Sequence, residues 1–222
     1  MCMANCERLQ HMTKLDWQAW HRPYDDPDSP LSRRLHVVQE LVRAVLDQAA
    51  PGSITAISIC AGEGRDLLGV LADHPRSADV AARLVELDPR NAEAARETAG
   101  RAGLGGVEVV TGDASISNAY DGAIPADLVL VCGVFGNISD RDVAHTIAHL
   151  PMLCAPGATV IWTRHRKPPN LTIKIRQWFA KHRFEEIAFV SPANTWGVGA
   201  HRFAGSHLPF TPDIKLFTFL ER

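Results

Sequence analysis

The sequence predicts an α/β fold in which a doubly wound, mostly parallel seven-stranded sheet has an antiparallel last strand and helices on both faces. Apolar runs of strand length alternate with segments of helical periodicity along most of the 222 residues. Strands that are apolar on both faces are typical of a parallel sheet that helices cover on each side. The C-terminal region differs, because residues 185–220 contain two strand-like runs with no helical segment between them. Without a crossover helix, the last strand should pair antiparallel with its predecessor.

The first half of the chain supplies three helices and three strands. Ser29 followed by Pro30 is typical of a helix N-cap with proline in the first turn. An apolar helical face follows at spacings of three and four residues, made of Leu31, Leu35, Val38, Val42 and Val45. The next expected elements are strand 54–60, a helix from about 64 to 73, strand 83–87, helix 89–102 and strand 106–110.

The second half completes the predicted sheet. Its expected elements are strand 127–132, helix 140–149, strand 158–163, helix 171–182, strand 185–190 and a final strand 215–220. Most of these strands are rich in Val, Ile and Leu, which favours a buried sheet.

Composition excludes several classes of protein. The formal net charge of −2 gives no basic footprint for nucleic acid. No apolar run approaches the roughly 18 residues that a membrane span needs. The five cysteines form no CxxC pair, which favours free thiols in a reducing cytoplasm. No carboxylate and histidine cluster has metal-ligand spacing, so we expect no metal. From the charge and the lack of a long apolar run we likewise expect neither nucleic acid nor membrane as a partner.

The most informative segment is the glycine-containing turn after the first strand. Cys60-Ala-Gly-Glu-Gly64 follows an apolar strand, and Glu86 lies about twenty residues further on, near the end of the next strand. Such a turn lets the main chain approach a ligand, and a carboxylate at that position accepts hydrogen bonds from ribose hydroxyls. The pattern predicts a site for an adenosine-containing cofactor. Asp88 is better explained as the N-cap of the following helix.

This order of elements resembles the class I S-adenosylmethionine-dependent methyltransferases over about residues 30–222. The likeness rests on the glycine turn, Glu86, Asp113 in Gly112-Asp-Ala114, and Val131-Cys-Gly-Val-Phe-Gly-Asn137 after the fourth strand. It implies that Asp113 accepts from the adenine amine, unless it is a turn aspartate that satisfies its own backbone. The cofactor-binding set it implies is Cys60, Ala61, Gly62, Gly64, Glu86, Leu87, Asp113, Ala114 and Cys132.

Two residues depart from the family pattern. Ser58 stands where the family often has an acid, and Cys60 where it has glycine, which puts a strand-end hydrogen bond to the methionyl amino group in doubt. Asp66 can cap the next helix instead of touching ligand. The chain is also similar to uncharacterised actinobacterial small-molecule methyltransferases, which share its aromatic N-terminal lead-in.

The resemblance divides the chain into an N-terminal arm, residues 1–29, and a cofactor-binding methyltransferase domain, residues 30–222. Residues 1–11 are expected to be disordered, and Met12 is an alternative start. Residues 12–29 are a candidate lid.

The acceptor side is harder to interpret. Candidate substrate residues are Trp20, Tyr24, Phe135, Asn137, His165 and His201. His165 follows the fifth strand and is the candidate general base, since imidazole titrates near neutrality. All of these candidates except Phe135 have a plainer alternative. Trp20 and Tyr24 can dock the arm, Asn137 can stabilise its loop, His165 can lie in a solvated basic loop, and His201 can be a polar step in an edge strand.

The sequence therefore predicts a cytoplasmic methyltransferase that acts on a small organic molecule at oxygen or nitrogen by in-line transfer. A non-catalytic protein that binds S-adenosylmethionine or S-adenosylhomocysteine is the first alternative, and an NAD-dependent oxidoreductase is the second. The sequence is compatible with a monomer or a homodimer.

Overall fold

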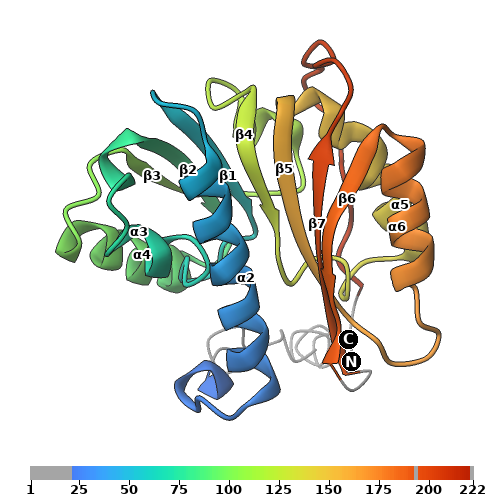
Figure 1. The fold of residues 1–222 in the computed structure, drawn as a ribbon, viewed down its shortest axis with the longest axis horizontal. Coiled ribbons are helices and arrows are strands. Elements are labelled where there is room, and N and C mark those ends of the chain that lie inside the picture. The colour runs from blue at the N-terminus through green and yellow to red at the C-terminus, as the bar shows by residue number, and fades with distance from the viewer. Residues whose placement is uncertain (1–21, 193–194, 221–222) are drawn as a thin grey trace, which may run out of the picture.

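Seven strands in the described part of the chain form one sheet in the order β3-β2-β1-β4-β5-β7-β6. The computed structural model describes residues 22–192 and 195–220, and Figure 1 shows the sheet from one face. The strands are β1 (Ile54–Ile59), β2 (Val80–Glu86), β3 (Val107–Thr111), β4 (Ala126–Val131), β5 (Cys154–His165), β6 (Phe184–Val190) and β7 (Trp196–Phe203). β7 is antiparallel to both β5 and β6, whereas the pairs from β3 to β5 are parallel. The predicted fold class is confirmed.

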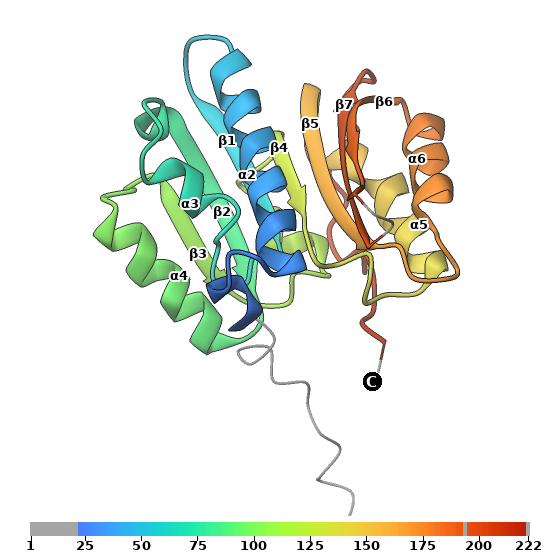
Figure 2. The ribbon, with the colours of Figure 1, turned by 60° about the horizontal axis from the view of Figure 1, so that its bottom comes forward.

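Helices cover both faces of this sheet (Figure 2). One layer holds α2 (Pro30–Gln48), α3 (Leu68–Leu71) and α4 (Pro89–Arg101), and the other holds α5 (Asp140–His149) and α6 (Thr172–Lys181). Four short 3₁₀ segments accompany them in the described residues: η1 (Arg22–Asp25), η2 (Ser77–Asp79), η3 (Ser117–Tyr120) and η4 (Leu150–Met152). Each layer buries its own apolar cluster against the sheet. Within the described residues, every helix is too short or too polar to cross a membrane.

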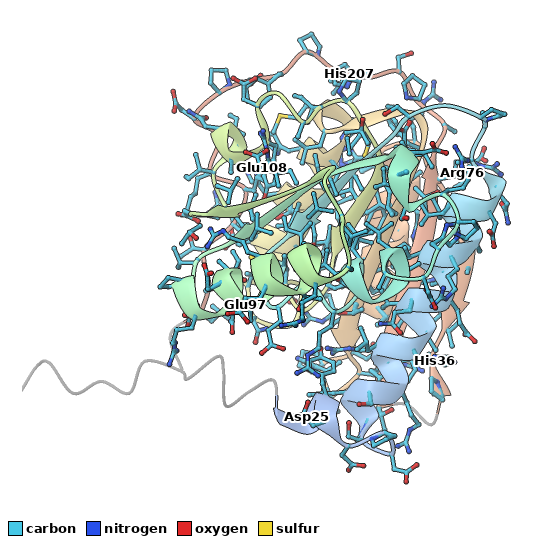
Figure 3. All side chains as sticks on the ribbon, turned by 90° about the vertical axis from the view of Figure 1, so that its left-hand side faces the viewer. Asp25, His36, Arg76, Glu97, Glu108 and His207 are labelled. Atoms are coloured by element: carbon cyan, nitrogen blue, oxygen red, sulfur yellow. The ribbon has the colours of Figure 1, made fainter. Side chains whose placement is uncertain are left out.

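The two ends of α2 are fixed by side chains. Ser29 accepts a hydrogen bond from the N–H of Ser32 at 3.0 Å, as an N-cap does. At the other end, the Arg76 guanidinium donates to the carbonyls of Ala49, Ala50 and Gly52. Figure 3 shows Arg76 and Asp25 at opposite ends of this helix. Arg34 and Leu35, on the N-terminal half of α2, lie near Cys60 and Glu86 at the carboxyl ends of β1 and β2.

The predicted final strand at 215–220 was wrong. The antiparallel strand is β7, and the C-terminal segment makes only isolated bridges to the described chain, between Ile116 and Lys215 and between Ile138 and Phe219. Its apolar pattern reflects burial of Leu216 and Phe217 in the core. The β7 strand contains glycines where aromatic rings leave no room for a side chain. A Cβ at Gly199 would collide with the Trp162 ring.

Three further elements differ from the predictions by three or more residues at a boundary. β2 begins at Val80, three residues before the expected start. The helix expected at about 64–73 is reduced to α3, because residues 61–67 form the turn that precedes it. β5 begins at Cys154, four residues before the expected start, since Ala126 pairs with Cys154 in the parallel ladder.

Candidate functional site

The turn after β1 is built from backbone in the left-handed region. Cys60, Gly62 and Gly64 have φ angles of 56°, 58° and 71°. A Cβ at Gly64 would lie 2.7 Å from the Leu68 side chain and 2.8 Å from that of Leu84, so only glycine fits without repacking. Cys60 adopts the same region with a side chain, at a cost of about 1 kcal/mol. The turn therefore presents nearly bare main chain at the end of β1.

Glu86 ends β2 and joins this turn. One carboxylate oxygen accepts a hydrogen bond from the Gly62 N–H at 2.8 Å, and the other accepts from the Asp88 N–H at 2.9 Å. The side chain is buried at 8% exposure and lines a cavity. A carboxylate has about four lone-pair sites, so acceptor capacity remains on the cavity side. Asp88 caps α4 by accepting from the Arg90 N–H, as predicted.

The first cavity lies along the carboxyl ends of β1, β2, β4 and β5. Its volume is about 130 Å³. The lining residues are Tyr24, Arg34, Leu35, Val38, Cys60, Ala61, Gly62, Glu63, Arg65, Asp66, Glu86, Leu87, Asn91, Cys132, Gly133, Thr163 and Phe219. Leu87 is 66% exposed, so an apolar side chain stands at the rim beside Glu86. Six predicted cofactor residues (Cys60, Ala61, Gly62, Glu86, Leu87 and Cys132) meet here, and Gly64 shapes the turn beneath them.

A buried carboxylate in this cavity was not predicted as a ligand group. Asp66 is 8% exposed and accepts from the Leu67 N–H at 2.9 Å. Burial raises the pKa of its carboxyl to about 6, against hydrogen bonds from Leu67 and the Cys132 thiol that lower it. Arg34 on α2 lines the same cavity and also favours the ionised form of Asp66. The Asp66 carboxyl and the Arg34 guanidinium thus line the same small cavity.

A cover of aromatic and charged groups closes one side. The Tyr24 hydroxyl accepts from Arg34 at 3.1 Å, and the Arg65 guanidinium lies 5.6 Å from the centre of the Tyr24 ring. Arg65 also forms an ion pair with Asp25 at 3.0 Å. Burial raises the pKa of Tyr24. These contacts hold η1 over the cavity, while Trp17 and Trp20 lie outside the described residues.

Two predicted cofactor residues do not line the cavity. Asp113 accepts from the N–H and hydroxyl of Ser115 and pairs with Lys215 at 3.0 Å. Burial alone would raise the pKa of Asp113, but these partners outweigh it and lower the pKa. Ala114 is buried in the core, and its carbonyl accepts from the Tyr120 hydroxyl. The contacts of Asp113 match the alternative of a turn aspartate.

Two predicted substrate residues are core residues, and neither is among the residues that line the first cavity. Phe135 is fully buried and packs against Trp162 and Phe179, with ring centres 6.1 and 6.5 Å apart. His201 is 1% exposed, stacks on Phe179 at 4.4 Å and accepts from the Trp162 indole N–H at 3.2 Å. Strand alternation explains this correction, because it turns His201 toward α6 and away from α2. Asn137 donates to the Gly133 carbonyl at 2.6 Å and so stabilises its loop.

A second cavity of about 880 Å³ adjoins the first. Arg34 lines both cavities, and His165 lines only the second. Thr163 and His165 lie two residues apart on β5, so they point to the same side of the sheet. The candidate base thus lies beside the cavity that holds Glu86. Within the described residues, no group of three or more His, Cys, Asp or Glu side chains is arranged to hold a metal ion.

Comparisons with known proteins relate this chain and its fold to methyltransferases. A family model described as "Putative methyltransferase" matches residues 31–190. An O-methyltransferase family protein from Burkholderia thailandensis is similar in structure, with 20% identity and a TM-score of 0.65, over 86% of this chain and 61% of that chain. Magnesium protoporphyrin IX methyltransferase (ChlM) from Synechocystis PCC 6803, solved with bound SAM, is 12% identical with a TM-score of 0.61, over 85% of this chain and 91% of that chain. No curated protein matches the sequence.

These likenesses differ in what they cover. This chain spans only 61% of the length of the Burkholderia protein. It spans 59% of the CurJ carbon methyltransferase, which is 13% identical to it with a TM-score of 0.64 over 86% of this chain. At such identities the solved structures show a shared fold, whereas the family match covers most of this chain.

Proposed function

This chain belongs to the family described as "Putative methyltransferase", and from that premise we propose that it transfers a methyl group from S-adenosylmethionine to an oxygen or nitrogen atom of a small organic molecule. The observation that carries the proposal is the Glu86 carboxylate, fixed to the Gly62 and Asp88 N–H groups at the wall of the first cavity. Such a carboxylate beside a bare glycine turn suits the two hydroxyls of a ribose. ChlM, which has the same fold, was solved with bound SAM and with bound SAH.

The remaining lining fits the rest of this donor. In the proposal, the main chain of residues 60–64 lies along the nucleoside and the exposed Leu87 side chain covers the adenine ring. Asp66 binds the methionyl ammonium group, and Arg34 binds the methionyl carboxylate. These assignments match charge to charge, since the amino-acid end of the donor is a zwitterion. Asp66 then does the work that an acid at Ser58 does in other family members.

The protein's part in catalysis is mainly positioning. When bound, the donor would supply a sulfonium methyl group: the acceptor atom forms a bond to the methyl carbon as the carbon–sulfur bond breaks, and S-adenosylhomocysteine leaves with a neutral thioether sulfur. The chain's residues hold the acceptor atom roughly 3–3.5 Å from the methyl carbon and exclude water. An acceptor that carries a proton loses it when the new bond forms. His165, in the adjoining cavity, takes that proton in this scheme.

The free thiols favour a reducing compartment. Cys60, Cys132 and Cys154 are described, and none is in a disulfide. Burial raises the pKa of all three thiols, which keeps them protonated and poorly reactive. We place the enzyme in the cytoplasm on this basis.

Calorimetry and labelled donor test the function. S-adenosylhomocysteine should bind to the purified protein, and NAD should not. Incubation with methyl-labelled S-adenosylmethionine and a metabolite extract should give labelled small molecules. Tight binding of the thioether without any labelled product would favour a non-catalytic binding protein. Binding of NAD in its place would overturn the proposal altogether.

A further inference from the structure

The second cavity has a marked excess of positive charge. Its lining includes Arg34, Arg166 and Lys167, together with the imidazole of His165. No Asp or Glu is among the described residues that line it. The whole chain carries a formal charge of −2, so this local excess runs against the general balance of the protein. A cavity lined by cations raises the local concentration of anions.

The guanidinium of Arg166 is only partly satisfied by the protein. Its Nη1 donates to the Ser191 hydroxyl at 2.7 Å, whereas its Nε is buried and has no acceptor within the described residues. The described residues place no carboxylate within ion-pair distance of Arg166 or Lys167. The neighbouring Arg164 also has a buried Nε without an acceptor, but its charge is balanced, because it pairs with Asp140 at 3.6 Å, and it donates to the Phe135 carbonyl. Arg166 and Lys167 therefore bring positive charge to the cavity wall without a carboxylate of the described residues to balance it, and an anion from outside the chain would supply that balance.

The rest of the cavity wall is apolar or uncharged. Pro30 and Leu31 come from the start of α2, Pro168 from the loop after β5, and Trp196 from the start of β7. The Trp196 side chain is largely buried at 6% exposure, so its ring is a fixed part of the wall. Such a wall suits a molecule with an apolar or aromatic body, and the cations suit an anionic group attached to it.

We propose that this second cavity is the acceptor site and that it takes small molecules bearing a carboxylate or phosphate group, an inference that rests on the proposed methyltransferase function. The anion lies against Arg166 and Lys167, and the apolar body extends past His165 toward Arg34 and the first cavity. Arg34 is at the boundary and serves the donor. The charge therefore anchors the acceptor by one end and leaves the other end to meet the methyl group.

A separated metabolite extract tests this directly. The extract is divided on an anion-exchange resin into a retained fraction of acids and an unretained fraction, and each is incubated with the protein and methyl-labelled S-adenosylmethionine. The retained fraction should give at least tenfold more labelled product. Label mainly from the unretained fraction would overturn the inference and leave the proposed function standing. Label from neither fraction would overturn both, and calorimetry with S-adenosylhomocysteine then shows whether donor binding survives.

Treatment of the retained fraction with a phosphatase separates the two sources of charge. Loss of the labelled product after treatment identifies a phosphate ester, and unchanged labelling identifies a carboxylate. Either result supports the cationic site, because both anions form charge-assisted hydrogen bonds with arginine and lysine.

Variants connect the result to the cavity. Arg166→Gln and Lys167→Gln should each lower product formation from limiting acidic substrate about tenfold, while S-adenosylhomocysteine affinity stays within twofold. Lys174→Gln is the matched control, since Lys174 is exposed on α6 and lines neither cavity. Lys167 is exposed, so its variant should fold even if Arg166→Gln does not. Wild-type rates in both folded variants would refute the assignment of the anion to these residues.

Discussion

The Glu86 carboxylate accepts a hydrogen bond from the Gly62 N–H at 2.8 Å and thereby joins the end of β2 to the turn after β1. The two residues are 24 positions apart in the sequence. β1 and β2 are paired in parallel register, with Ile59 opposite Val85, so the carboxyl ends of both strands lie at the same edge of the sheet. The carboxylate therefore orders the turn and faces the cavity at once.

Replacement of this carboxylate should reduce donor binding strongly. Glu86→Gln keeps the size of the side chain but loses the charge and one acceptor. Since hydrogen bonds to charged groups are worth about 1.5–3 kcal/mol, S-adenosylhomocysteine affinity should fall by about tenfold to a hundredfold. Glu93→Gln, at an exposed position on α4 outside the cavity, is the control. Unchanged affinity in calorimetry of Glu86→Gln would remove the ribose assignment.

Asp66 should link donor binding to pH. Burial raises its pKa to about 6, so the carboxyl is ionised above that pH and protonated below it. If it binds the methionyl ammonium group, S-adenosylhomocysteine affinity falls as pH drops through about 6, by up to tenfold per pH unit. Asp66→Asn should bind weakly and show a flatter profile. A variant with wild-type affinity from pH 5 to 8 would exclude this contact.

The same residue should lower the stability of the empty protein at neutral pH. Its folded-state pKa is above the ordinary value of 3.8, so stability is greatest below that value and is lost as pH rises through about 6. Asp66→Asn removes this penalty and keeps an oxygen for the Leu67 N–H. Its free energy of unfolding should exceed that of the wild type by about 1–3 kcal/mol at pH 8. Urea unfolding at pH 4 and 8 gives the comparison, and the gain should be absent at pH 4.

His201 should make the fold sensitive to acid. Burial lowers its pKa from 6.5 to about 4, although Glu186 partly opposes the change. With a depressed folded-state pKa, the neutral imidazole contributes stability that is complete above pH 6.5 and decreases as pH falls toward 4. Over that window the wild type should lose about 3 kcal/mol through this group. His201→Gln should lose less between pH 7 and 4 in urea unfolding, and a loss equal to that of the wild type would contradict the prediction.

The fold was predictable where burial produced a clear pattern of apolar residues in the sequence. Six of the seven strands were expected near their observed positions, because parallel strands buried on both faces appear as apolar runs. β7 was missed because Gly197 and Gly199 remove the expected side chains on one face. The reason lies in tertiary structure: the rings of Phe189 and Trp162 occupy the space beside these glycines.

The site was predictable only in its backbone-encoded part. The glycine turn and Glu86 meet because consecutive parallel strands end at one edge. Asp66, Arg34 and Phe219 reach the first cavity from a turn, a helix and the C-terminal segment, and no local spacing indicates that they converge. Phe135 and His201 are core residues because their side chains point to the α6 side of the sheet. Knowing that a residue lies near the end of a strand does not tell which face its side chain points to.

The aromatic contact over Gly199 gives a stability test of the corrected strand. Gly199→Ala forces a Cβ into the Trp162 ring, and overpacking of this kind costs about 1–3 kcal/mol. The matched control is Gly100→Ala on α4, where an added Cβ meets nothing within 4 Å. That control should be neutral or up to about 1 kcal/mol more stable, because alanine favours helix. Equal thermal unfolding of the two variants would argue against the packing of β7 on β5.

Arg34 should distinguish the amino-acid end of the donor from its nucleoside end. It lines both cavities, donates to the Tyr24 hydroxyl and lies near Asp66. If it binds the methionyl carboxylate, Arg34→Gln weakens S-adenosylhomocysteine about tenfold or more. Binding of 5′-methylthioadenosine, which lacks the amino-acid group, should stay within twofold of wild type. Arg33→Gln, exposed one position earlier on α2, should change neither affinity. Equal weakening of both ligands would mean that Arg34 supports the cavity as a whole instead of binding the carboxylate.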